Sequence, residues 1–573
     1  MNEDFRKHAP EPLEALQFRV PTPVETTLSC GLKVVAVHDE RHPLVSFRLA
    51  FGAGDINDPE GRTGVSSAMA SLLNEGTENY SSRELAEAID AIGADLSASS
   101  ASDHTVVKAS GLSAFVPKVL DLLAELVLRP VFPEKELDLY RQNTIEGLKY
   151  QRSQPDFLAD EQVSRIVYGD HPYSVNSPSE RDIGALKRDW LTEIHKSSFI
   201  PNNAVLVVVG DVEPSILFEE LETRFAGWEG GEVPQRDYPA FPERSGRTLT
   251  VVDRPGSTQA NIVLSNIAID RRSPDYFPTL VMNQVLGAGA SSRLFMNLRE
   301  EKGYTYGAYS RIIARRFGGS FEASAEVRTA VTGDSLKEFF YELERIRSEG
   351  VSETELADAK NYLMGVFPIR VETQGALIGQ ITAQRIYGLP DDYLETYCEN
   401  VSKVSAEDVS RVANLYVHPE SIAMVIVGDA EEVLPLTQEY CGDVEVEVYD
   451  TDGNRRDTSA YAAVDAGTPD ADIEGRWDLT VLAQGQELAL ILDLEGSGDA
   501  VTGHLESMLG QGTLRDAAVN GNRIKASIVT EMRGQELELG LKGSVTGDEM
   551  VGTLVIPMMP EPLEFKGRRV DTV

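Results

Sequence analysis

Residues 64–77 read Gly-Val-Ser-Ser-Ala-Met-Ala-Ser-Leu-Leu-Asn-Glu-Gly-Thr, and this stretch is the most informative one in the chain. Its pattern of apolar and small residues predicts a helix from Gly64 to Leu73. Ser67, Ala70 and Ser71 are three and four positions apart, so they share one face of that helix. An activated serine needs a neighbouring base and an oxyanion hole, and no G-x-S-x-G turn or nearby histidine accompanies these serines. We therefore expect small filler residues on this face rather than nucleophiles.

The same spacing resembles the inverted zinc motif of the insulinase-like (pitrilysin, inverzincin) metallopeptidases, whose helix reads G-L-A-H-x-x-E-H-M-L-F-K-G-T. In that alignment Ser67 and Ser71 take the places of the two histidines, and Ala70 takes the place of the glutamate. A serine hydroxyl is a poor zinc ligand, and alanine cannot take a proton from zinc-bound water. The resemblance thus implies a helix that keeps the packing pattern of the family without its metal chemistry.

A third zinc ligand of the family, a glutamate, lies on a later helix in a pattern similar to E-R-x-x-x-x-x-E. The run that resembles it here starts at Tyr140, in place of the upstream supporting glutamate, and the ligand position falls on Gly147. Glu146 is adjacent, but one step along a helix turns a side chain by about 100°, away from the site. Since every position of the metal constellation is substituted, we expect this chain to bind no metal itself.

A later segment keeps residues that the family uses on its substrate. Residues 292–306 read Ser-Arg-Leu-Phe-Met-Asn-Leu-Arg-Glu-Glu-Lys-Gly-Tyr-Thr-Tyr, similar to the family pattern S-R-L-F-x-x-L-R-E-x-x-G-x-x-Y, and they follow a glycine-rich run at 287–289. In active members the arginine and tyrosine of this pattern reach toward substrate at the zinc, so the resemblance implies that role for Arg299 and Tyr306. Tyr304 is the weaker match for the tyrosine. The structural alternative is an arginine paired with a nearby acid and a tyrosine packed in a strand.

The chain also repeats itself at long range. The run 32–35 matches 249–252 at an offset of 217 positions, and Val-Gly-Asp at 209–211 matches Val-Gly-Asp at 427–429 at an offset of 218. The first pair opens a β-rich run, and the second pair closes a strand that follows a helix. This repetition predicts two homologous halves.

We place the halves at residues 20–235 and 245–445. Each combines predicted strands, such as 44–51, with predicted helices, such as 134–152, without regular alternation. That mixture indicates an α+β fold in which helices cover one face of a mainly antiparallel sheet. The family resemblance covers about residues 20–445 and implies the same fold.

The remaining segments are an N-terminal extension (1–19), an acidic linker (446–472) and a β-rich domain (473–573). Acidic residues and glycines already replace hydrophobic periodicity from Glu431 onward, which is typical of a linker. Beyond Gly475, short alternating runs separated by glycine turns predict an all-β domain that closes into a small barrel. The predicted strands are 488–494, 501–505, 524–530, 537–541 and 551–555. We find no polar constellation in this segment, so we expect a structural or docking role for it.

The composition sets limits on partners and location. The chain has 573 residues, 42% of them hydrophobic and 25% charged, with a net charge of −39 and a pI near 4.6. Such acidity argues against nucleic acid and against an anionic membrane surface as partners. The N-terminus lacks the pattern of a signal peptide, and three widely spaced cysteines suggest no disulfide framework. We therefore expect a cytoplasmic protein, or a periplasmic one if a leader was removed.

Histidines offer no replacement metal site. Of eight histidines, only His38 and His42 have the four-residue spacing that could bring two rings to one helix face. The intervening Glu40 is not beside either histidine, and Pro43 follows directly. A polar turn between two strands is the better interpretation.

Some bacterial members of the family divide the work between two chains: one carries the zinc motif, and the other lacks it and contributes the arginine and tyrosine. The resemblance implies that this chain is the second kind, a non-catalytic subunit of a heterodimeric zinc peptidase. It would bind a peptide or small-protein substrate and supply Arg299 and Tyr306 to a homologous, zinc-bearing partner. An alternative stays open: a peptidase-derived structural or peptide-binding protein with no role in catalysis, similar to core subunits of respiratory complexes.

Overall fold

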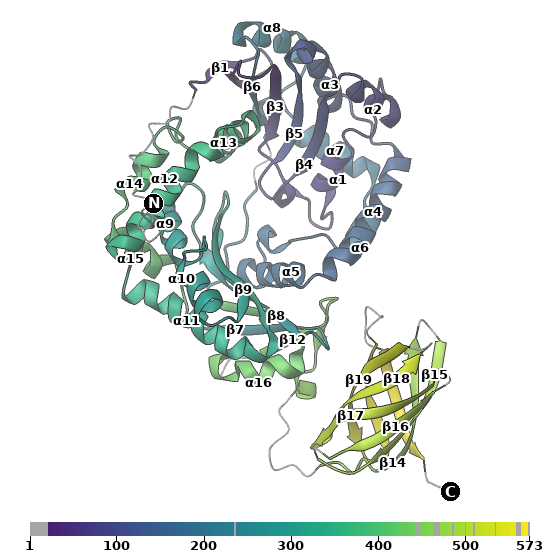
Figure 1. Ribbon diagram of the computed structural model, residues 1–573. Helices are drawn as coiled ribbons and strands as arrows, with labels where there is room; N and C mark the ends of the chain where they lie inside the picture. Colours follow the sequence, from purple (N-terminus) through teal and green to yellow (C-terminus); the bar gives the residue numbers. More distant parts are fainter. Residues whose placement is uncertain are drawn as a thin grey trace, which may run out of the picture. The chain divides into compact units, whose positions relative to one another are not determined.

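The computed structural model describes residues 21–233, 236–441, 446–461, 470–483, 486–498, 500–507, 510–532, 535–556 and 563–570. The chain forms two compact units, one with two sheet-and-helix halves and one with a β-barrel (Figure 1). The expected α+β class with a C-terminal all-β domain is therefore confirmed. The predicted N-terminal extension, 1–19, lies outside the described residues. No described helix combines the length and apolar character needed to cross a membrane.

The first half is built on a six-stranded sheet in the order β1-β2-β6-β3-β5-β4. Its neighbouring strands are antiparallel except for the parallel pair β2 and β6, so the sheet is mainly antiparallel as expected. The strands are β1 (Val24–Thr27), β2 (Lys33–His38), β3 (Leu44–Phe51), β4 (Asp95–Ser100), β5 (Thr105–Leu112) and β6 (Ala204–Gly210). The helices are α1 (Val65–Ser71), α2 (Ser82–Asp90), α3 (Val116–Leu128), α4 (Glu134–Arg152), α5 (Pro155–Tyr168), α6 (Glu180–Ala185), α7 (Arg188–Ser198) and α8 (Pro214–Phe225).

The second half repeats this plan in a seven-stranded sheet in the order β13-β12-β7-β11-β8-β10-β9. Strands β7, β11, β8, β10 and β9 stand where β2, β6, β3, β5 and β4 stand in the first sheet, which confirms the internal duplication. The strands are β7 (Thr248–Asp253), β8 (Gln259–Ala268), β9 (Thr305–Ala314), β10 (Gly319–Arg328), β11 (Ala423–Gly428), β12 (Val446–Tyr449) and β13 (Arg455–Arg456). The helices are α9 (Tyr276–Leu286), α10 (Arg293–Phe295), α11 (Thr332–Ser348), α12 (Glu353–Arg370), α13 (Gln374–Tyr387), α14 (Tyr397–Lys403), α15 (Ala406–Tyr416) and α16 (Ala430–Cys441), with a π-helical turn η6 (Met296–Glu301) after α10.

The two halves exchange a helix with each other. Helix α5 comes from the first half, yet its Leu158 and Val163 pack against β7, β8 and β11 of the second sheet. Helix α13 comes from the second half and lies against β3 and β6 of the first sheet (Figure 1). There Arg48 on β3 donates a hydrogen bond to the Gly375 carbonyl of α13 at 3.2 Å. Each sheet therefore receives one helix from the other half, in addition to the helices of its own half.

A buried carboxylate joins the halves at a second point. Asp103, between β4 and β5, is 2% exposed. It accepts hydrogen bonds from the Tyr173 hydroxyl of the first half and from the Arg316 backbone N–H of the second half, the latter at 3.0 Å. The Arg316 guanidinium also donates to the Gly52 and Ile386 carbonyls. A buried carboxylate with several donors is stable only while those donors stay in place, so the contact holds the halves together.

The predicted linker needs correction. The acidic stretch that begins at Glu431 contains helix α16 and strands β12 and β13, and the last two extend the second sheet. The range assigned to the linker, 446–472, therefore begins inside that sheet, and its residues 462–469 lie outside the described ones. The strands have four and two residues, too few to show an alternation of apolar and polar positions.

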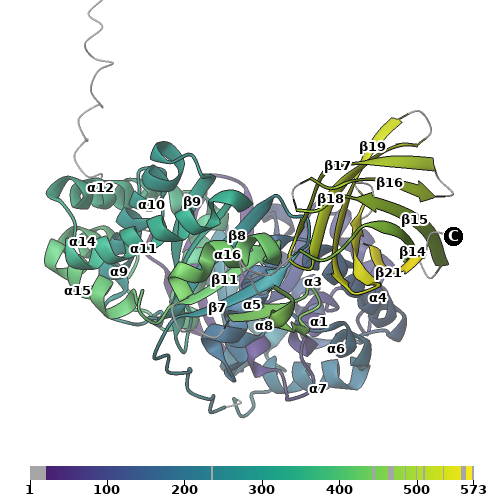
Figure 2. The same ribbon diagram turned by 90° about the horizontal axis from the view of Figure 1, so that it is seen from below.

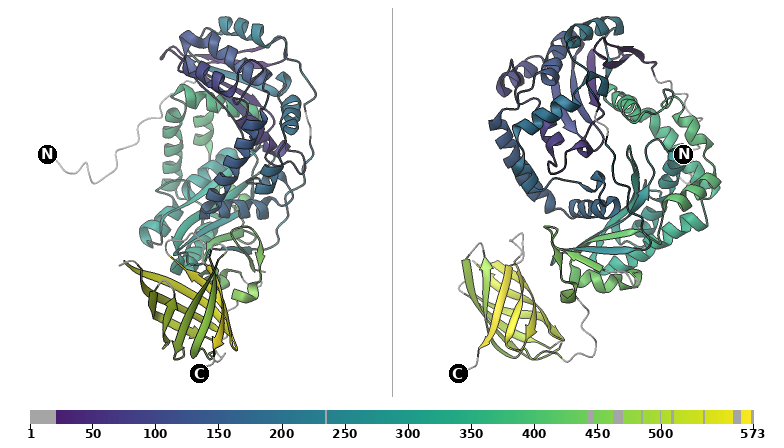
Figure 3. Two further views of the ribbon diagram at one scale, coloured as in Figure 1. Left: turned by 90° about the vertical axis from the view of Figure 1, so that its right-hand side faces the viewer. Right: turned by 180° about the vertical axis from the view of Figure 1, so that it is seen from behind.

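The C-terminal segment forms a closed antiparallel barrel of eight strands, which confirms the predicted barrel (Figures 2 and 3). Its strands are β14 (Gly475–Ala483), β15 (Gln486–Glu495), β16 (Thr502–Ser507), β17 (Gly510–Asn520), β18 (Arg523–Met532), β19 (Gln535–Thr546), β20 (Glu549–Val555) and β21 (Leu563–Val570). Strands β14, β17 and β21 were not among the predicted ones. Strand β21 pairs with β14 and closes the cylinder.

One contact pins the chain segment that enters the barrel. Trp477 is fully buried, and its indole N–H donates to the Ile473 carbonyl at 2.9 Å. The Arg569 guanidinium lies 4.8 Å from the Trp477 ring centroid and donates to the Glu474 carbonyl at 2.9 Å and to Asp472 at 3.0 Å. The first and last strands of the barrel are thus joined through a cation–π contact and hydrogen bonds to the entering segment.

The helix exchange predicts that the two halves unfold together. Replacing Leu158 with alanine should lower the free energy of unfolding by about 2–4 kcal/mol, because it removes a buried side chain between α5 and the second sheet. Calorimetry should show both halves in one shifted transition. The exposed Arg165→Ala on the same helix is the matched control, expected within about 0.5 kcal/mol of the unsubstituted chain. Two separate transitions, only one of them shifted, would contradict the interlock.

The contact at the barrel entrance makes a separate prediction. Arg569→Ala should destabilise the barrel by about 1–2 kcal/mol, since it removes the stacked guanidinium and its hydrogen bonds. Urea unfolding followed by tryptophan fluorescence measures this effect. Arg568→Ala is the control, because Arg568 is the exposed neighbour on the same strand. Equal effects of the two substitutions would show that the Trp477 contact contributes nothing.

Candidate functional site

Helix α1 carries the positions that correspond to the zinc motif, and the residues before it fix where it starts. Gly64 has a φ of 86°, a conformation that favours glycine. The Asp58 carboxylate accepts the N–H groups of Gly64 at 2.6 Å and Ser66 at 3.0 Å, which satisfies donors at the start of the helix. Burial raises the pKa of Asp58 to about 6, and the nearby Asp55 carboxylate adds to the shift. The helix frame is therefore specified by its own local sequence.

The three substituted positions on α1 have different surroundings. The Ser67 hydroxyl donates to Asp55 at 3.0 Å, and burial raises the pKa of Asp55 above its ordinary value. Ala70 is fully buried, whereas Ser71 is exposed. None of these side chains offers the nitrogen or negatively charged oxygen that zinc prefers. Their donor chemistry does not fit a catalytic metal.

Helix α4 carries the other two substituted positions, Tyr140 and Gly147. Burial raises the pKa of the Tyr140 hydroxyl, while its hydrogen bonds with Thr144 and Ser71 act in the opposite direction. Tyr140 therefore lies next to α1. Gly147, two turns farther along α4, is exposed, and a Cβ atom added there would meet no atom within 4 Å. Among the described residues, no group of three or more His, Cys, Asp or Glu side chains is arranged to hold a metal ion.

Arg299 lies on the π-helical turn η6 and faces outward. Its side chain is 45% exposed, its Nε is 3.5 Å from the half-exposed Glu300 carboxylate, and its guanidinium lies 4.8 Å from the Phe295 ring centroid. An exposed pair of this kind contributes little to stability. The guanidinium therefore keeps most of its donors available for a ligand.

Tyr306 is the most exposed of the large side chains in this region. It is 91% exposed on β9, which is an edge strand of the second sheet, and it does not pack in that sheet. Tyr304 is only half-exposed. The two predicted residues, Arg299 and Tyr306, are thus placed on one connected turn and strand with their polar ends accessible.

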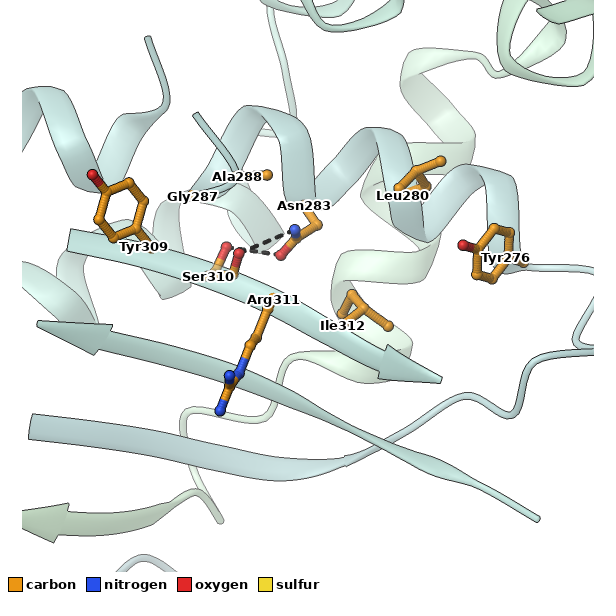
Figure 4. A pocket seen from close by; sticks show the side chains of 9 residues that line it. All are labelled: Tyr276, Leu280, Asn283, Gly287, Ala288, Tyr309, Ser310, Arg311 and Ile312. Atoms are coloured by element: carbon orange, nitrogen blue, oxygen red, sulfur yellow. Dashed lines mark hydrogen bonds between the residues drawn. The ribbon is translucent and has the colours of Figure 1, made fainter. Parts of the chain in front are cut away.

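A cavity of about 300 Å³ lies between α9 and β9, beside this segment (Figure 4). Asn283 on α9 and Ser310 on β9 hydrogen-bond each other at its wall, and the Ser310 N–H donates to the Gly287 carbonyl at 2.9 Å. A Cβ atom on Gly287 would lie 2.3 Å from the Ser310 nitrogen, so only glycine fits there. The sequence pointed to the glycine run, but it gave no sign of Asn283 or Ser310.

Two family models match the chain in sequence order. The model described as insulinase, peptidase family M16, matches residues 33–177, and the model described as peptidase M16 inactive domain matches residues 185–363. The matched ranges fall on the first half and on the region that runs into the second half. Both models describe the insulinase-like family that the sequence resembles.

Individual proteins agree with this assignment. The chain is 24% identical over 410 residues to a protein of Bacillus subtilis named uncharacterized zinc protease YmxG, covering 70% of this chain and 97% of that protein. It is 22% identical over 412 residues to the Helicobacter pylori protein named non-peptidase homolog YmxG, covering 70% of this chain and 93% of that protein. Each of these alignments leaves about 30% of this chain unmatched.

Solved structures show the same fold. The crystal structure of a peptidase M16 inactive domain from Pseudomonas fluorescens superposes with a TM-score of 0.66 at 27% identity. The match covers 71% of this chain and 98% of that chain. A protease from Helicobacter pylori gives a TM-score of 0.66 at 22% identity, covering 71% of this chain and 100% of its own. Both halves share one sheet plan, and both matching family models describe M16 peptidases. The chain therefore belongs to the insulinase-like peptidase family M16, as a relative in which the positions of the metal ligands are substituted.

Proposed function

We propose that this chain is the non-catalytic subunit of a heterodimeric zinc peptidase, in which it binds a peptide or small-protein substrate. A homologous partner would carry the zinc and its ligands. The observation that carries the proposal is the contrast between the two sites: α1 and α4 have lost every metal ligand, whereas Arg299 and Tyr306 are presented with exposed polar ends. The peptidase-derived binding protein without a catalytic role is the competing function.

The chemistry of the two side chains suits a substrate amide. A guanidinium has a fixed fork of donors that can bind peptide carbonyl oxygens, and a phenol can donate to an oxygen that gains negative charge when water attacks. Neither Arg299 nor Tyr306 has a described carboxylate partner that would use up this capacity, apart from the weak Glu300 contact. In trans, the pair would stabilise the transition state while the partner supplies metal and base.

Substitution of the pair tests this proposal directly. The chain is first purified together with any co-purifying chain that carries an intact H-x-x-E-H, and peptidase activity is measured on the mixture. Arg299→Ala or Tyr306→Phe should lower kcat about 10²–10³-fold, because a preorganised donor in the transition state is lost. The exposed Arg328→Ala and Tyr341→Phe are matched controls. Undiminished activity of both site variants would favour the competing binding function.

Restoring the ligands tests whether α1 and α4 keep the geometry of the family's metal site. A triple variant, Ser67→His, Ser71→His and Gly147→Glu, should take up about one zinc ion per chain, because three ligands suffice for a tetrahedral site with one open position. The open space around Gly147 accommodates the glutamate. Metal analysis after dialysis measures the stoichiometry, and the double variant that keeps Gly147 is the control. Equal zinc in the two variants would mean that α1 and α4 do not retain the family geometry.

A further inference from the structure

The turn that carries Arg299 has an unusual backbone. The Lys302 N–H donates to the Asn297 carbonyl at 3.0 Å, a step of five residues that defines the π-helical turn η6. Such turns are rare and are found frequently at functional sites. Because one extra residue rotates the following side chains by about 100°, the turn changes where later residues of the segment point.

The start of the same segment is anchored by an ion pair between a buried arginine and a partly exposed glutamate. Arg293 on α10 has a side chain that is 6% exposed, and it donates to Glu355 of α12 at 2.7 Å and to the Gly350 carbonyl at 2.7 Å. Hydrogen bonds from Arg293 and Ser352 hold the pKa of Glu355 at about 2, although burial opposes them. The chain thus enters the π-helical turn from a fixed point.

Two glutamates of α11 hold the turn itself. The Asn297 amide nitrogen donates to Glu338 at 3.0 Å and to Glu342 at 3.0 Å, and the Lys302 ammonium pairs with Glu338 at 3.1 Å. Glu342 is 2% exposed and also pairs with Arg345. We refer to Asn297, Lys302, Glu338 and Glu342 as the clamp.

Placing carboxylates here is costly unless their partners stay in position. A buried charge requires a partner and further hydrogen bonds to offset its lost hydration, so Glu342 favours the arrangement in which Asn297 faces it. The clamp contacts the turn at both of its ends. The Arg299 side chain, between Asn297 and Lys302, lies over the Phe295 ring at 4.8 Å from its centroid and is 45% exposed.

We propose that the clamp positions Arg299 for substrate: Asn297 and Glu342, helped by Lys302 and Glu338, fix the π-helical turn so that the guanidinium projects from this face. This inference rests on the proposed function, because it assigns a positioning role in the same site. Asn297 and Glu342 do not touch substrate themselves. They act by limiting the directions that the Arg299 side chain can take.

The decisive variant is Asn297→Asp, which keeps the size of the side chain and places a third carboxylate beside Glu338 and Glu342. Near pH 8 the three like charges should repel one another and loosen the turn. Hydrogen–deuterium exchange of the full chain should show amides 297–303 exchanging about tenfold faster or more. Asn361→Asp, at an exposed position on α12, is the matched control and should leave exchange unchanged. Equal exchange in the two variants would overturn the clamp.

Activity of the mixture with the zinc-bearing partner connects the clamp to Arg299. Asn297→Asp should lower kcat about tenfold with KM within about twofold, and it should cause no further loss in an Arg299→Ala background, since the positioned residue is then absent. Additive losses would overturn the positioning role. Lys302→Gln is the second variant if Asn297→Asp does not fold. It lies at a partly exposed position and removes only the ion pair with Glu338, so it should raise amide exchange less than Asn297→Asp does.

The two proposals fail in different ways. If Arg299→Ala lowers kcat and Asn297→Asp does not, the proposed function stands and the positioning role is wrong. If Arg299→Ala leaves kcat unchanged, both fail. If Asn297→Asp speeds exchange and lowers kcat only when Arg299 is present, both are supported.

Discussion

The exchange of α5 and α13 between the two sheets is the packing constraint on which the first unit depends. Each sheet has an apolar face that its own half leaves uncovered, as the buried Val425 of β11 and the fully apolar β6 show. Leaving such faces in water would cost about 25 cal/mol per Å² of apolar surface. The covering helix comes from the other half in both cases, so the two halves form one packed structure.

Local patterns in the sequence were sufficient for single elements. The predicted strand 44–51 and the predicted helix 134–152 coincide with β3 and α4, because a strong alternation or a strong helical stripe specifies its own period. The repeat between the halves was also readable, since equivalent strands keep similar residues at a constant offset. The exchange of α5 and α13 between the sheets could not be predicted from the sequence. Periodicity shows that a face is apolar, and it does not show which distant element covers that face.

Two of the strands that the sequence missed break the alternating pattern for different physical reasons. Strand β17 contains a bulge between Arg515 and Ala518, which breaks the two-residue period, and β21 carries Lys566, Arg568 and Arg569. In the candidate site, Arg299 was found through a long matching segment. Its support by Glu342 was not found, because the carboxylate lies 43 positions away on another helix and only the fold brings it near.

The two sites follow opposite rules. On α1, small residues and the Ser67–Asp55 hydrogen bond maintain the packing of the helix. Metal binding would need ligands of specific charge and geometry, so the helix can keep its packing without them. On η6, a rare backbone turn and a buried carboxylate are retained around one exposed arginine, although a regular helix with apolar neighbours would be simpler to stabilise. Keeping a costly arrangement beside a polar group that the chain itself does not use is physically reasonable when the group acts on another molecule.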